Sequence, residues 1–259
     1  MNNKNPSIKD FIQKRLEFCI TEHPISNRYH LFKDKLREKV IISQLGCPTA
    51  TLYKVFESPD DIELSYIPNS FVIKLSFQSL SRGVIKVKNN INLATGKKFN
   101  LKESIHYLNK FFKSTIKYQK VIVEELLEPE IPNTSLLDIK VFYLKGEPLF
   151  LQCIDPKERP PDRNYLRYHF NTKWERVDIH NQEAPLHKTM KKPKCLEEIL
   201  KWGKIIANKY FKNTFIRIDF YPTNKGCVFG ETTLCPNFDC KENINKKYGA
   251  IFFKENIDI

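Results

Sequence analysis

Two acidic residues, Asp219 and Glu231, lie in stretches that otherwise have the composition of buried strands. Asp219 stands between Ile218 and Phe220, and Glu231 closely follows Val228-Phe229. An ionised carboxylate is costly to bury without a partner, and two carboxylates side by side are costlier still. The pair therefore either faces water or holds a positively charged group between its members.

A hairpin loop between these two stretches would bring the carboxylates together. The sequence Asn224-Lys225-Gly226 is typical of a three-residue loop in which the glycine takes the positive φ of a bulge. Centring the hairpin on its lysine pairs Asp219 with Glu231. It also pairs Arg217 with Thr233 on the same face, because side chains alternate along a strand. A four-residue loop would instead place the two acids on opposite faces.

Facing carboxylates repel each other unless a cation separates them. Mg²⁺ takes oxygen ligands, commonly one or two carboxylates together with phosphate oxygens and water. Asp219 and Glu231 therefore have the chemistry of a magnesium–nucleotide site, and Arg217 on the same face can meet a phosphate. The alternative is a solvent-facing hairpin in which Arg217 simply neutralises the two acids.

The elements around this hairpin mix helical and strand patterns. Helices are predicted over residues 7–20, 33–45, 101–117 and 196–211, and strands over residues 51–56, 71–77, 83–87, 121–127, 138–144 and 148–154, with edge strands at 165–170 and 173–179. In the first helix, Ile8, Phe11, Ile12, Leu16 and Cys19 share the face expected to point inward. Hairpin-linked strands mixed with helices imply an α+β fold with mostly antiparallel sheets.

The composition is that of an ordinary globular protein with an excess of positive charge. The 259 residues include 41% hydrophobic and 28% charged side chains, enough for a substantial core. A net charge of +13 favours an anionic partner such as a nucleotide, an acidic polysaccharide or an anionic membrane surface. No nucleic acid is expected, because no recognition motif is present and the aromatic residues do not interleave with basic ones.

Targeting and cysteine patterns indicate a reducing compartment. No apolar run approaches membrane-spanning length and the N-terminus lacks the apolar stretch of a secretory signal, so a cytoplasmic location is expected, with peripheral membrane association left open. The seven cysteines are odd in number and scattered, which favours free thiols. Cys235 and Cys240 have no second pair with zinc spacing, so no zinc site is expected.

Five short segments follow one another along the chain, and their order is more specific for a protein family than any single segment. Residues 217–221 (RIDFY) and 230–233 (GETT) form the strands of the hairpin. Before them come residues 71–74 (FVIK), 121–127 (VIVEELL) and 138–142 (DIKVF). Together, over about residues 35–240, these segments resemble the TupA-like branch of the ATP-grasp superfamily.

The resemblance implies an ATP-grasp fold, in which two α+β lobes with mostly antiparallel sheets hold ATP between them. A lead-in segment would cover residues 1–60, a small lobe with the phosphate loop residues 61–127, and a C-terminal lobe residues 128–259. The metal-binding hairpin belongs to the last of these.

The resemblance also assigns roles to residues of this chain. The nucleotide-binding set consists of Lys74, Ser79, Ser81, Arg82, Gly83, Glu124, Glu125, Leu126, Leu127 and Lys140, with the segment 124–127 holding adenine through its backbone. Arg217 and Lys140 are the implied catalytic residues, and Asp219, Glu231 and Thr233 the implied ligands of Mg²⁺. The loop after Lys74 departs from the family pattern, since it contains one glycine where the family usually has several.

The implied activity is that of a carboxylate–amine ligase that uses ATP and Mg²⁺ to form an acylphosphate and then an amide. The acceptor would be a uronic-acid carboxylate of a cell-surface polysaccharide or its precursor, an acidic carbohydrate, and the second substrate a small amine. Two alternatives remain: an ATP-dependent kinase with a hydroxyl acceptor, and a degenerate ATP-grasp module that binds an acidic polymer. The glycine-poor loop favours the second.

Overall fold

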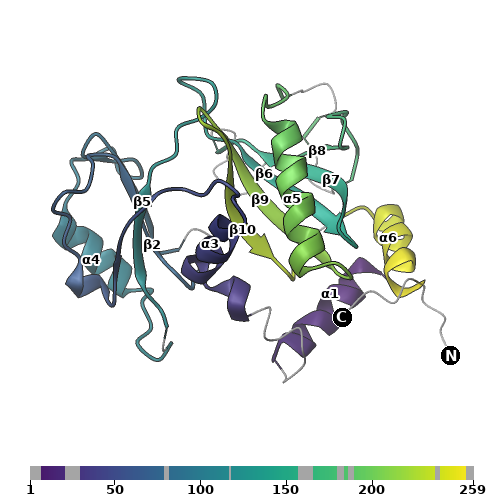
Figure 1. Ribbon diagram of the computed structural model, residues 1–259, viewed down its shortest axis with the longest axis horizontal. Helices are drawn as coiled ribbons and strands as arrows, with labels where there is room; N and C mark the ends of the chain where they lie inside the picture. Colours follow the sequence, from purple (N-terminus) through teal and green to yellow (C-terminus); the bar gives the residue numbers. More distant parts are fainter. Residues whose placement is uncertain are drawn as a thin grey trace. The chain divides into compact units, whose positions relative to one another are not determined.

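The computed structural model describes most of the chain, with the elements labelled in Figure 1. Described are residues 7–20, 30–78, 82–116, 118–156, 166–179, 184–185, 190–236 and 240–254, without the side chains of residues 18–20 and 250–254. The chain divides into two compact units. Unit 1 comprises Met1–Phe32 and Glu128–Ile259, and unit 2 comprises Lys33–Leu127.

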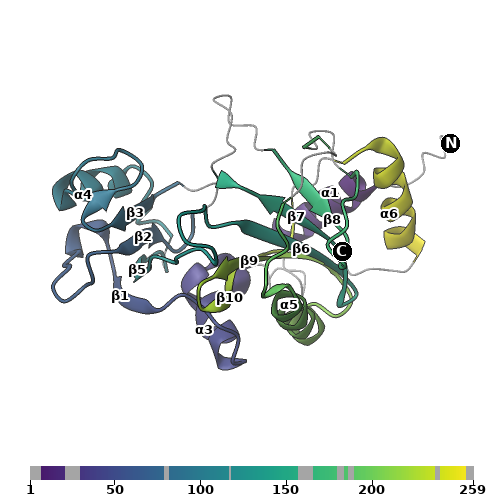
Figure 2. The ribbon, with the colours of Figure 1, turned by 90° about the horizontal axis from the view of Figure 1, so that it is seen from above.

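Unit 1 is built on a five-stranded antiparallel sheet. Its strands lie in the order β10 (Gly226–Thr233), β9 (Phe215–Thr223), β6 (Asp138–Leu144), β7 (Glu147–Ile154) and β8 (Tyr168–Phe170). Helix α5 (Leu196–Tyr210) packs on one face of the sheet, and α1 (Ile8–Ile20) and α6 (Glu242–Lys254) lie side by side against the other (Figure 2). None of the described helices is long and apolar enough to cross a membrane.

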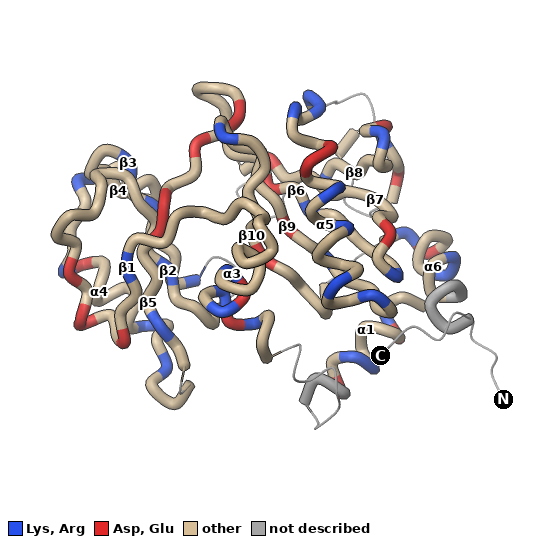
Figure 3. Tube along the Cα trace, viewed as in Figure 1, with Lys and Arg blue, Asp and Glu red and all other residues tan. Residues whose placement is uncertain are grey.

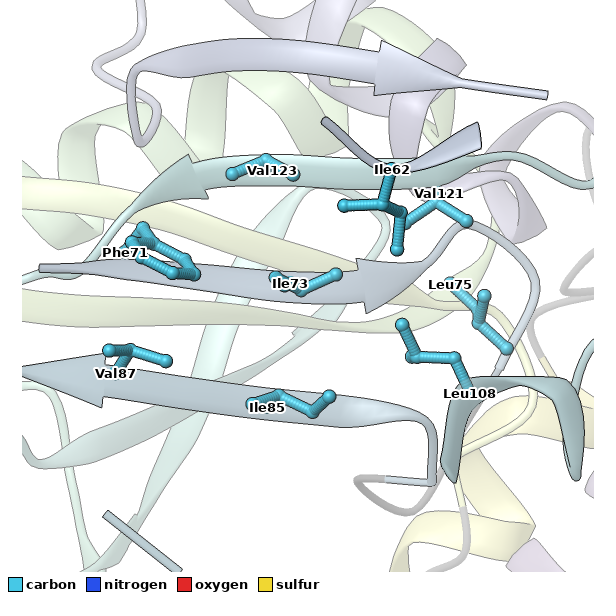
Figure 4. Packing of buried hydrophobic residues seen from close by; sticks show 9 residues of the cluster. All are labelled: Ile62, Phe71, Ile73, Leu75, Ile85, Val87, Leu108, Val121 and Val123. Atoms are coloured by element: carbon cyan, nitrogen blue, oxygen red, sulfur yellow. The ribbon is translucent and has the colours of Figure 1, made fainter. Parts of the chain in front are cut away.

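Unit 2 contains a second five-stranded antiparallel sheet. Its strands lie in the order β1 (Leu52–Phe56), β5 (Val121–Glu125), β2 (Phe71–Leu75), β3 (Val84–Lys88) and β4 (Ile91–Asn92), accompanied by helices α3 (Lys35–Gln44) and α4 (Leu101–Asn109) and the 3₁₀ helix η1 (Pro59–Asp61). Alternate residues of β2, β3 and β5 point to one face and pack with Leu108 of α4 (Figure 4). Because side chains alternate, the opposite face carries Lys74 and Glu124. The predicted α+β class with antiparallel sheets is confirmed in both units.

Helix α4 ends at Asn109, earlier than the predicted end at residue 117. The N–H groups of Phe111 and Phe112 donate to the same helix carbonyl, which tightens the backbone into a turn. Lys113 N then donates to Gln119 Oε1 at 2.7 Å instead of continuing the helical pattern. Pairing with a side chain farther along the chain thus ends the helix where periodicity alone extends it.

The predicted edge strand over residues 173–179 is wrong, since that stretch contributes only an isolated bridge to β8. The side chain of Asn171 accepts hydrogen bonds from Lys173 N at 2.9 Å and from Glu175 N at 3.0 Å. These bonds fold the chain into a turn of the kind that asparagine favours. The stretch before it does form an edge strand, β8, beside β7.

Helix α1 turns only part of the predicted face inward, and Ile12 packs against the core as predicted. Ile8 and Phe11 are buried as expected, but Leu16 is 38% exposed and Arg15 is fully buried. The guanidinium of Arg15 donates hydrogen bonds to carbonyl and hydroxyl oxygens inside unit 1. Leu16 has no donor for these oxygens, so Arg15 rather than Leu16 faces inward. Cys19, predicted on the same face, belongs to the part of α1 whose side chains are not described.

The hairpin loop between β9 and β10 is shorter than predicted. Thr223 and Gly226 already pair, so the loop holds two residues rather than three. Thr223 Oγ1 accepts a hydrogen bond from Lys225 N at 3.1 Å and donates to Gly226 O at 2.8 Å, and these two bonds close the turn. Gly226 has the expected positive φ, at +101°.

A bulge at Gly230 restores the predicted register. Phe229 pairs with Phe220 and Glu231 pairs with Asp219, so Gly230 is an extra residue of β10. A Cβ at Gly230 would lie 3.1 Å from the backbone oxygen of Asp219, which leaves little room for any larger residue. The predicted pairing of the two acids is therefore confirmed, although the loop and the bulge together produce it.

Gly203 of α5 provides a test of the packing in unit 1. A Cβ at this position would lie 1.9 Å from Tyr143 Oη and 2.5 Å from Tyr143 Cζ. Helix propensity alone favours alanine over glycine by about 1 kcal/mol, but overpacking costs roughly 1–3 kcal/mol. We expect Gly203→Ala to lower the free energy of unfolding in urea.

The control is Lys201→Ala, which changes an exposed position of the same helix. It should alter the free energy of unfolding by less than about 0.5 kcal/mol. A Gly203→Ala protein that is more stable than wild type would contradict the close approach of α5 to β6.

Candidate active site

One row of side chains crosses the sheet of unit 1. Strand pairing places Glu231 beside Asp219, Asp219 beside Lys140, Lys140 beside Gln152, and Gln152 beside His169, one residue from each of the five strands. Because paired residues share a face, the whole row lies on the face opposite α5. Helices α1 and α6 pack on the same face around Phe142, Phe150 and Phe215.

Asp219 stands between Glu231 and Lys140 in this row and is almost fully buried. Arg217 donates from Nε to Oδ1 at 2.7 Å and from Nη2 to Oδ2 at 2.8 Å, and Lys140 donates to Oδ2 at 2.7 Å. Burial alone would raise the pKa of the Asp219 carboxyl, but the two cations outweigh it and hold the pKa below its ordinary value. Asp219 is therefore ionised in the folded protein.

Lys140 is shared between two carboxylates, because its Nζ also donates to Asp138 Oδ2 at 2.6 Å. Burial would lower the pKa of Lys140, but the two carboxylates raise it above its ordinary value. The Asp-x-Lys motif drew attention to the lysine and left Asp138 without a role. Asp138 Oδ1 is buried with no hydrogen-bond partner, and burial together with the charge of Asp219 raises the pKa of this carboxyl.

Glu231 and Thr233 stand on β10 beside these groups. The Glu231 side chain is 36% exposed, and its Oε1 lies 3.6 Å from Arg217 Nη2. Thr233 is half-buried and lies opposite Arg217, as predicted. The predicted metal ligands and the two predicted catalytic residues therefore share one face of three adjacent strands.

The donor set of this cluster fits a magnesium ion. Asp138, Asp219 and Glu231 are three carboxylates, and Lys140 and Arg217 supply part of the positive charge that they need. The part of the chain that the structure describes holds no group of three or more acidic, histidine or cysteine side chains around one metal position. Asp219 and Glu231 are paired carboxylates on adjacent strands, and one or two carboxylates is the number that Mg²⁺ commonly takes from a protein at nucleotide sites.

A second cluster forms around Glu124 in unit 2. The Glu124 side chain is buried, Lys74 Nζ lies 2.5 Å from its Oε1, and Lys39 Nζ donates to its Oε2. Lys39 also donates to Ala50 O at 2.8 Å. Three elements, α3, β2 and β5, therefore converge on one carboxylate. The Glu124 side chain is a counterion here, in addition to the backbone role implied for it.

Two ammonium groups share this one carboxylate, so the cluster suits an anionic ligand. Burial alone would raise the pKa of Glu124, but Lys74 and Lys39 hold it below its ordinary value. Burial lowers the pKa of Lys39, and the nearby ammonium of Lys74 adds to this effect. Sequence reasoning missed Lys39, because it lies in a helix among other charged residues. The only signal for it was an acid within the apolar strand 121–127, which required a cation nearby.

The loop after β2 is described only in part. Ser79 and Ser81 lie outside the described residues. The Arg82 side chain is exposed, and Gly83 has a positive φ of +62°. A Cβ at Gly83 would lie 2.9 Å from Leu75 Cδ1, so this glycine also allows close packing against β2.

The end of β5 is hydrogen-bonded to Thr51, which directly precedes β1. Glu125 N donates to Thr51 O at 2.9 Å, and Glu125 Oε2 accepts a hydrogen bond from Thr51 Oγ1 at 2.9 Å. Leu126 and Leu127 are half-buried. Thr51 thus fixes the backbone at the start of the segment predicted to hold adenine.

Comparison with solved structures identifies the fold. D-alanine–D-alanine ligase from Helicobacter pylori matches with a TM-score of 0.53 and 19% identity, covering 85% of this chain and 60% of the ligase. D-alanyl-alanine synthetase A from Vibrio cholerae matches with a TM-score of 0.56 and 15% identity, covering 87% and 63%. N5-carboxyaminoimidazole synthetase from Staphylococcus aureus matches with a TM-score of 0.52 and 13% identity, covering 88% and 52%. The shared fold is that of the ATP-grasp proteins.

The family follows from the sequence as a whole. The family model described as TupA-like ATPgrasp matches residues 20–254, which is well over half of the chain. The chain therefore belongs to the TupA-like ATP-grasp family, as its motifs predicted. Among curated proteins, none matches the chain. The chain spans about 60% of the length of the Helicobacter pylori ligase.

Asp219 and Glu231 should differ in their effect on stability. Asp219→Asn leaves Arg217 and Lys140 buried without their shared carboxylate, and breaking a buried ion pair costs roughly 3–5 kcal/mol. Glu231→Gln removes a partly exposed carboxylate, so we expect a loss below about 1 kcal/mol. Urea unfolding measures both, and equal losses would contradict the assignment of Asp219 as the buried partner of both cations.

Glu124 should make the stability of unit 2 depend on pH. Its pKa in the folded protein lies below the unfolded value of about 4.3, so its contribution is present above that value and is lost as the pH falls through the folded pKa. We expect Glu124→Gln to be less stable than wild type at neutral pH. The gap should narrow as the pH falls from about 5 to about 3.

Urea unfolding at a series of pH values measures this gap. Glu103→Gln, which changes an exposed carboxylate of the same unit, is the matched control and should follow the wild-type profile. A gap between wild type and Glu124→Gln that stays constant with pH would show that the carboxylate is not held by the two lysines.

Proposed function

We propose that the protein is an ATP- and Mg²⁺-dependent carboxylate–amine ligase. The observation that carries the proposal is the meeting of Arg217, Asp219, Glu231 and Lys140 on one face of a sheet, in a chain of the TupA-like ATP-grasp family. Family membership supports the reaction class, and the cluster has the charges that phosphoryl transfer requires.

Lys74 and Lys39 are proposed to receive the phosphates of the nucleotide. An arriving phosphate meets two ammonium groups that share the carboxylate of Glu124. Lysine is almost never fully buried without a partner, and this shared partner holds both side chains in position before the nucleotide binds. The backbone of residues 124–127 would bind adenine.

Asp219 and Glu231 are proposed to hold Mg²⁺, with the Thr233 hydroxyl beside them. Bound there, the ion would neutralise phosphate oxygens and polarise the phosphoryl group that is transferred. Asp219 is fixed by Arg217 and Lys140, whereas Glu231 is partly exposed and open to approach from solvent. One ligand is thus rigid and the other accessible.

The reaction would proceed in two steps. A carboxylate oxygen of the acceptor attacks the γ-phosphorus of ATP, ADP leaves, and an acylphosphate forms. An amine nitrogen then attacks the acyl carbon, inorganic phosphate leaves with the bridging oxygen, and the nitrogen loses a proton to give the amide.

Arg217 and Lys140 would stabilise the negative charge that develops on the transferred phosphoryl group. Burial would lower the pKa of each side chain, but the neighbouring carboxylates raise both values above the ordinary range. Both groups therefore remain cationic at neutral pH. Their positive charge is fixed in place before the substrate arrives, which is the condition for effective electrostatic stabilisation.

The acceptor is proposed to be a uronic-acid carboxylate of a cell-surface polysaccharide or its precursor, and the second substrate a small amine. The net charge of +13 suits an acidic carbohydrate. Basic positions are spread along the helices and strands of both units rather than gathered in one block (Figure 3). Use of ATP is consistent with a cytoplasmic site of action.

Mass spectrometry of the products tests this reaction. The protein is incubated with ATP, Mg²⁺, small amines and uronic acids whose carboxylates carry ¹⁸O. We expect ADP, an amide, and inorganic phosphate that carries one ¹⁸O atom from the carboxylate. A stable phosphorylated product formed without amine would favour a kinase instead. Failure to bind Mg–ATP at millimolar concentration would favour a module that only binds an acidic polymer.

Glu231→Gln is the most informative variant for the metal assignment. We expect kcat/KM for ADP formation to fall by roughly 100-fold or more, because a ligand of the ion is lost, while urea unfolding stays close to wild type. Glu197→Gln changes an exposed carboxylate on α5, at the opposite face of the sheet, and should leave turnover unchanged. Unchanged turnover in Glu231→Gln would contradict the metal assignment.

A further inference from the structure

Arg15 of α1 is fully buried, although it lies outside the predicted apolar face of the helix. Burying a guanidinium is costly unless its N–H groups find acceptors. Its position is therefore determined by the oxygen atoms that it reaches. The guanidinium also lies over the ring of Phe11, 4.5 Å from the centroid, which supports it from its own helix.

The acceptors of Arg15 come from the ends of two neighbouring strands. Nη1 donates to Phe215 O and, at 2.8 Å, to Leu234 O, while Nη2 donates to Thr214 Oγ1. Phe215 is the first residue of β9, and Leu234 directly follows the last residue of β10. One side chain thus joins the beginning of one strand to the end of its partner.

These oxygens lie directly beyond the last rung of the β9–β10 ladder, the pair Arg217–Thr233. The next pair on the same face is Asp219–Glu231. Strand ends open readily when nothing holds them, and a slip of one residue turns every side chain to the other face. Arg15 occupies the position of a further rung, because it binds a carbonyl group from each strand.

We propose that Arg15 is a positioning residue that holds the ends of β9 and β10 in register for Arg217, Asp219 and Glu231. It acts through the backbone of the two strands and does not belong to the row of side chains that crosses the sheet. Its effect on catalysis rests on the proposed function, whereas its effect on the strands does not.

Helix α1 lies almost entirely before the region matched by the family model, which begins at residue 20. Within the described chain, the proposed clamp is thus supplied by a segment outside that region and acts on strands inside it. Ile8 of the same helix packs into the hydrophobic cluster with Phe142 and Phe215 through apolar contacts. Ile8 therefore offers a matched control, since its truncation weakens the docking of α1 and leaves the guanidinium in the chain.

Hydrogen exchange of the intact protein tests the clamp without depending on catalysis. Arg15→Met keeps a long side chain and removes the hydrogen bonds to the strand ends. We expect it to speed amide exchange in peptides covering residues 215–219 and 231–235 by about tenfold or more relative to peptides of β7. Ile8→Ala should leave this ratio close to the wild-type value. Equal acceleration in the two variants, or none in Arg15→Met, would overturn the proposal.

Arg15→Lys provides a second test, which does not require Arg15→Met to fold. A lysine keeps the charge and can reach fewer of the three oxygen atoms than the forked guanidinium. We expect exchange in residues 231–235 to be faster than in wild type and, where Arg15→Met folds, slower than in that variant. Wild-type exchange rates in Arg15→Lys would overturn the proposal.

The catalytic consequence is measured separately. Arg15→Met should lower kcat for ADP formation and raise the Mg²⁺ concentration that gives half the maximal rate, each by roughly 10- to 100-fold. The Kd for ATP without Mg²⁺, which depends on Lys39 and Lys74, should stay unchanged. A merely structural arginine would alter the amount of folded protein and leave the Mg²⁺ requirement as it is, which would overturn the proposal. If wild type forms no ADP, the proposed function fails and the exchange experiment alone decides the clamp.

Discussion

The unit 1 site depends on the ion pairs that the buried carboxylate of Asp219 forms with Arg217 and Lys140. None of the three charges would be stable at this depth alone, because desolvation of a single ion costs several kcal/mol. Lys140 faces Asp219 across the β6–β9 pair, so the three groups satisfy one another in one register of these strands. A change in the register of β6 and β9 would therefore also separate the charges that neutralise one another.

The charged clusters of the two units have an excess of opposite sign. In unit 2, the ammonium groups of Lys39 and Lys74 share one carboxylate, which leaves positive charge for an anion. In unit 1, carboxylates from β6, β9 and β10 gather around Lys140 and Arg217, which suits a cation. The cluster of each unit is thus suited to a charged group of one sign, and neither cluster would suit an apolar molecule.

The residues of this site that could be predicted from the sequence were recognisable for one physical reason. Asp219 and Glu231 stand out because acids are rare in apolar strands, and the two-residue period of a strand then tells which residues share a face. Arg15 and Lys39 lie in helices, where a charged residue normally faces water. Their burial depends on oxygen atoms that other parts of the chain contribute, such as Leu234 O and Ala50 O. No local pattern records such a partner, and the early end of α4 at a bond to Gln119 has the same cause.

The bulge at Gly230 limits how this hairpin can change in length. With the two-residue loop alone, Asp219 would stand opposite Gly230, and Glu231 would point to the face that α5 covers. The extra residue reverses this and returns Glu231 to the side of Asp219. An insertion or deletion of one residue at the tip would therefore bury an acid against α5 unless a second, opposite change occurred at the bulge. Relatives in which the loop has three residues and the bulge is absent would keep the same site, and relatives with only one of these changes would lose it.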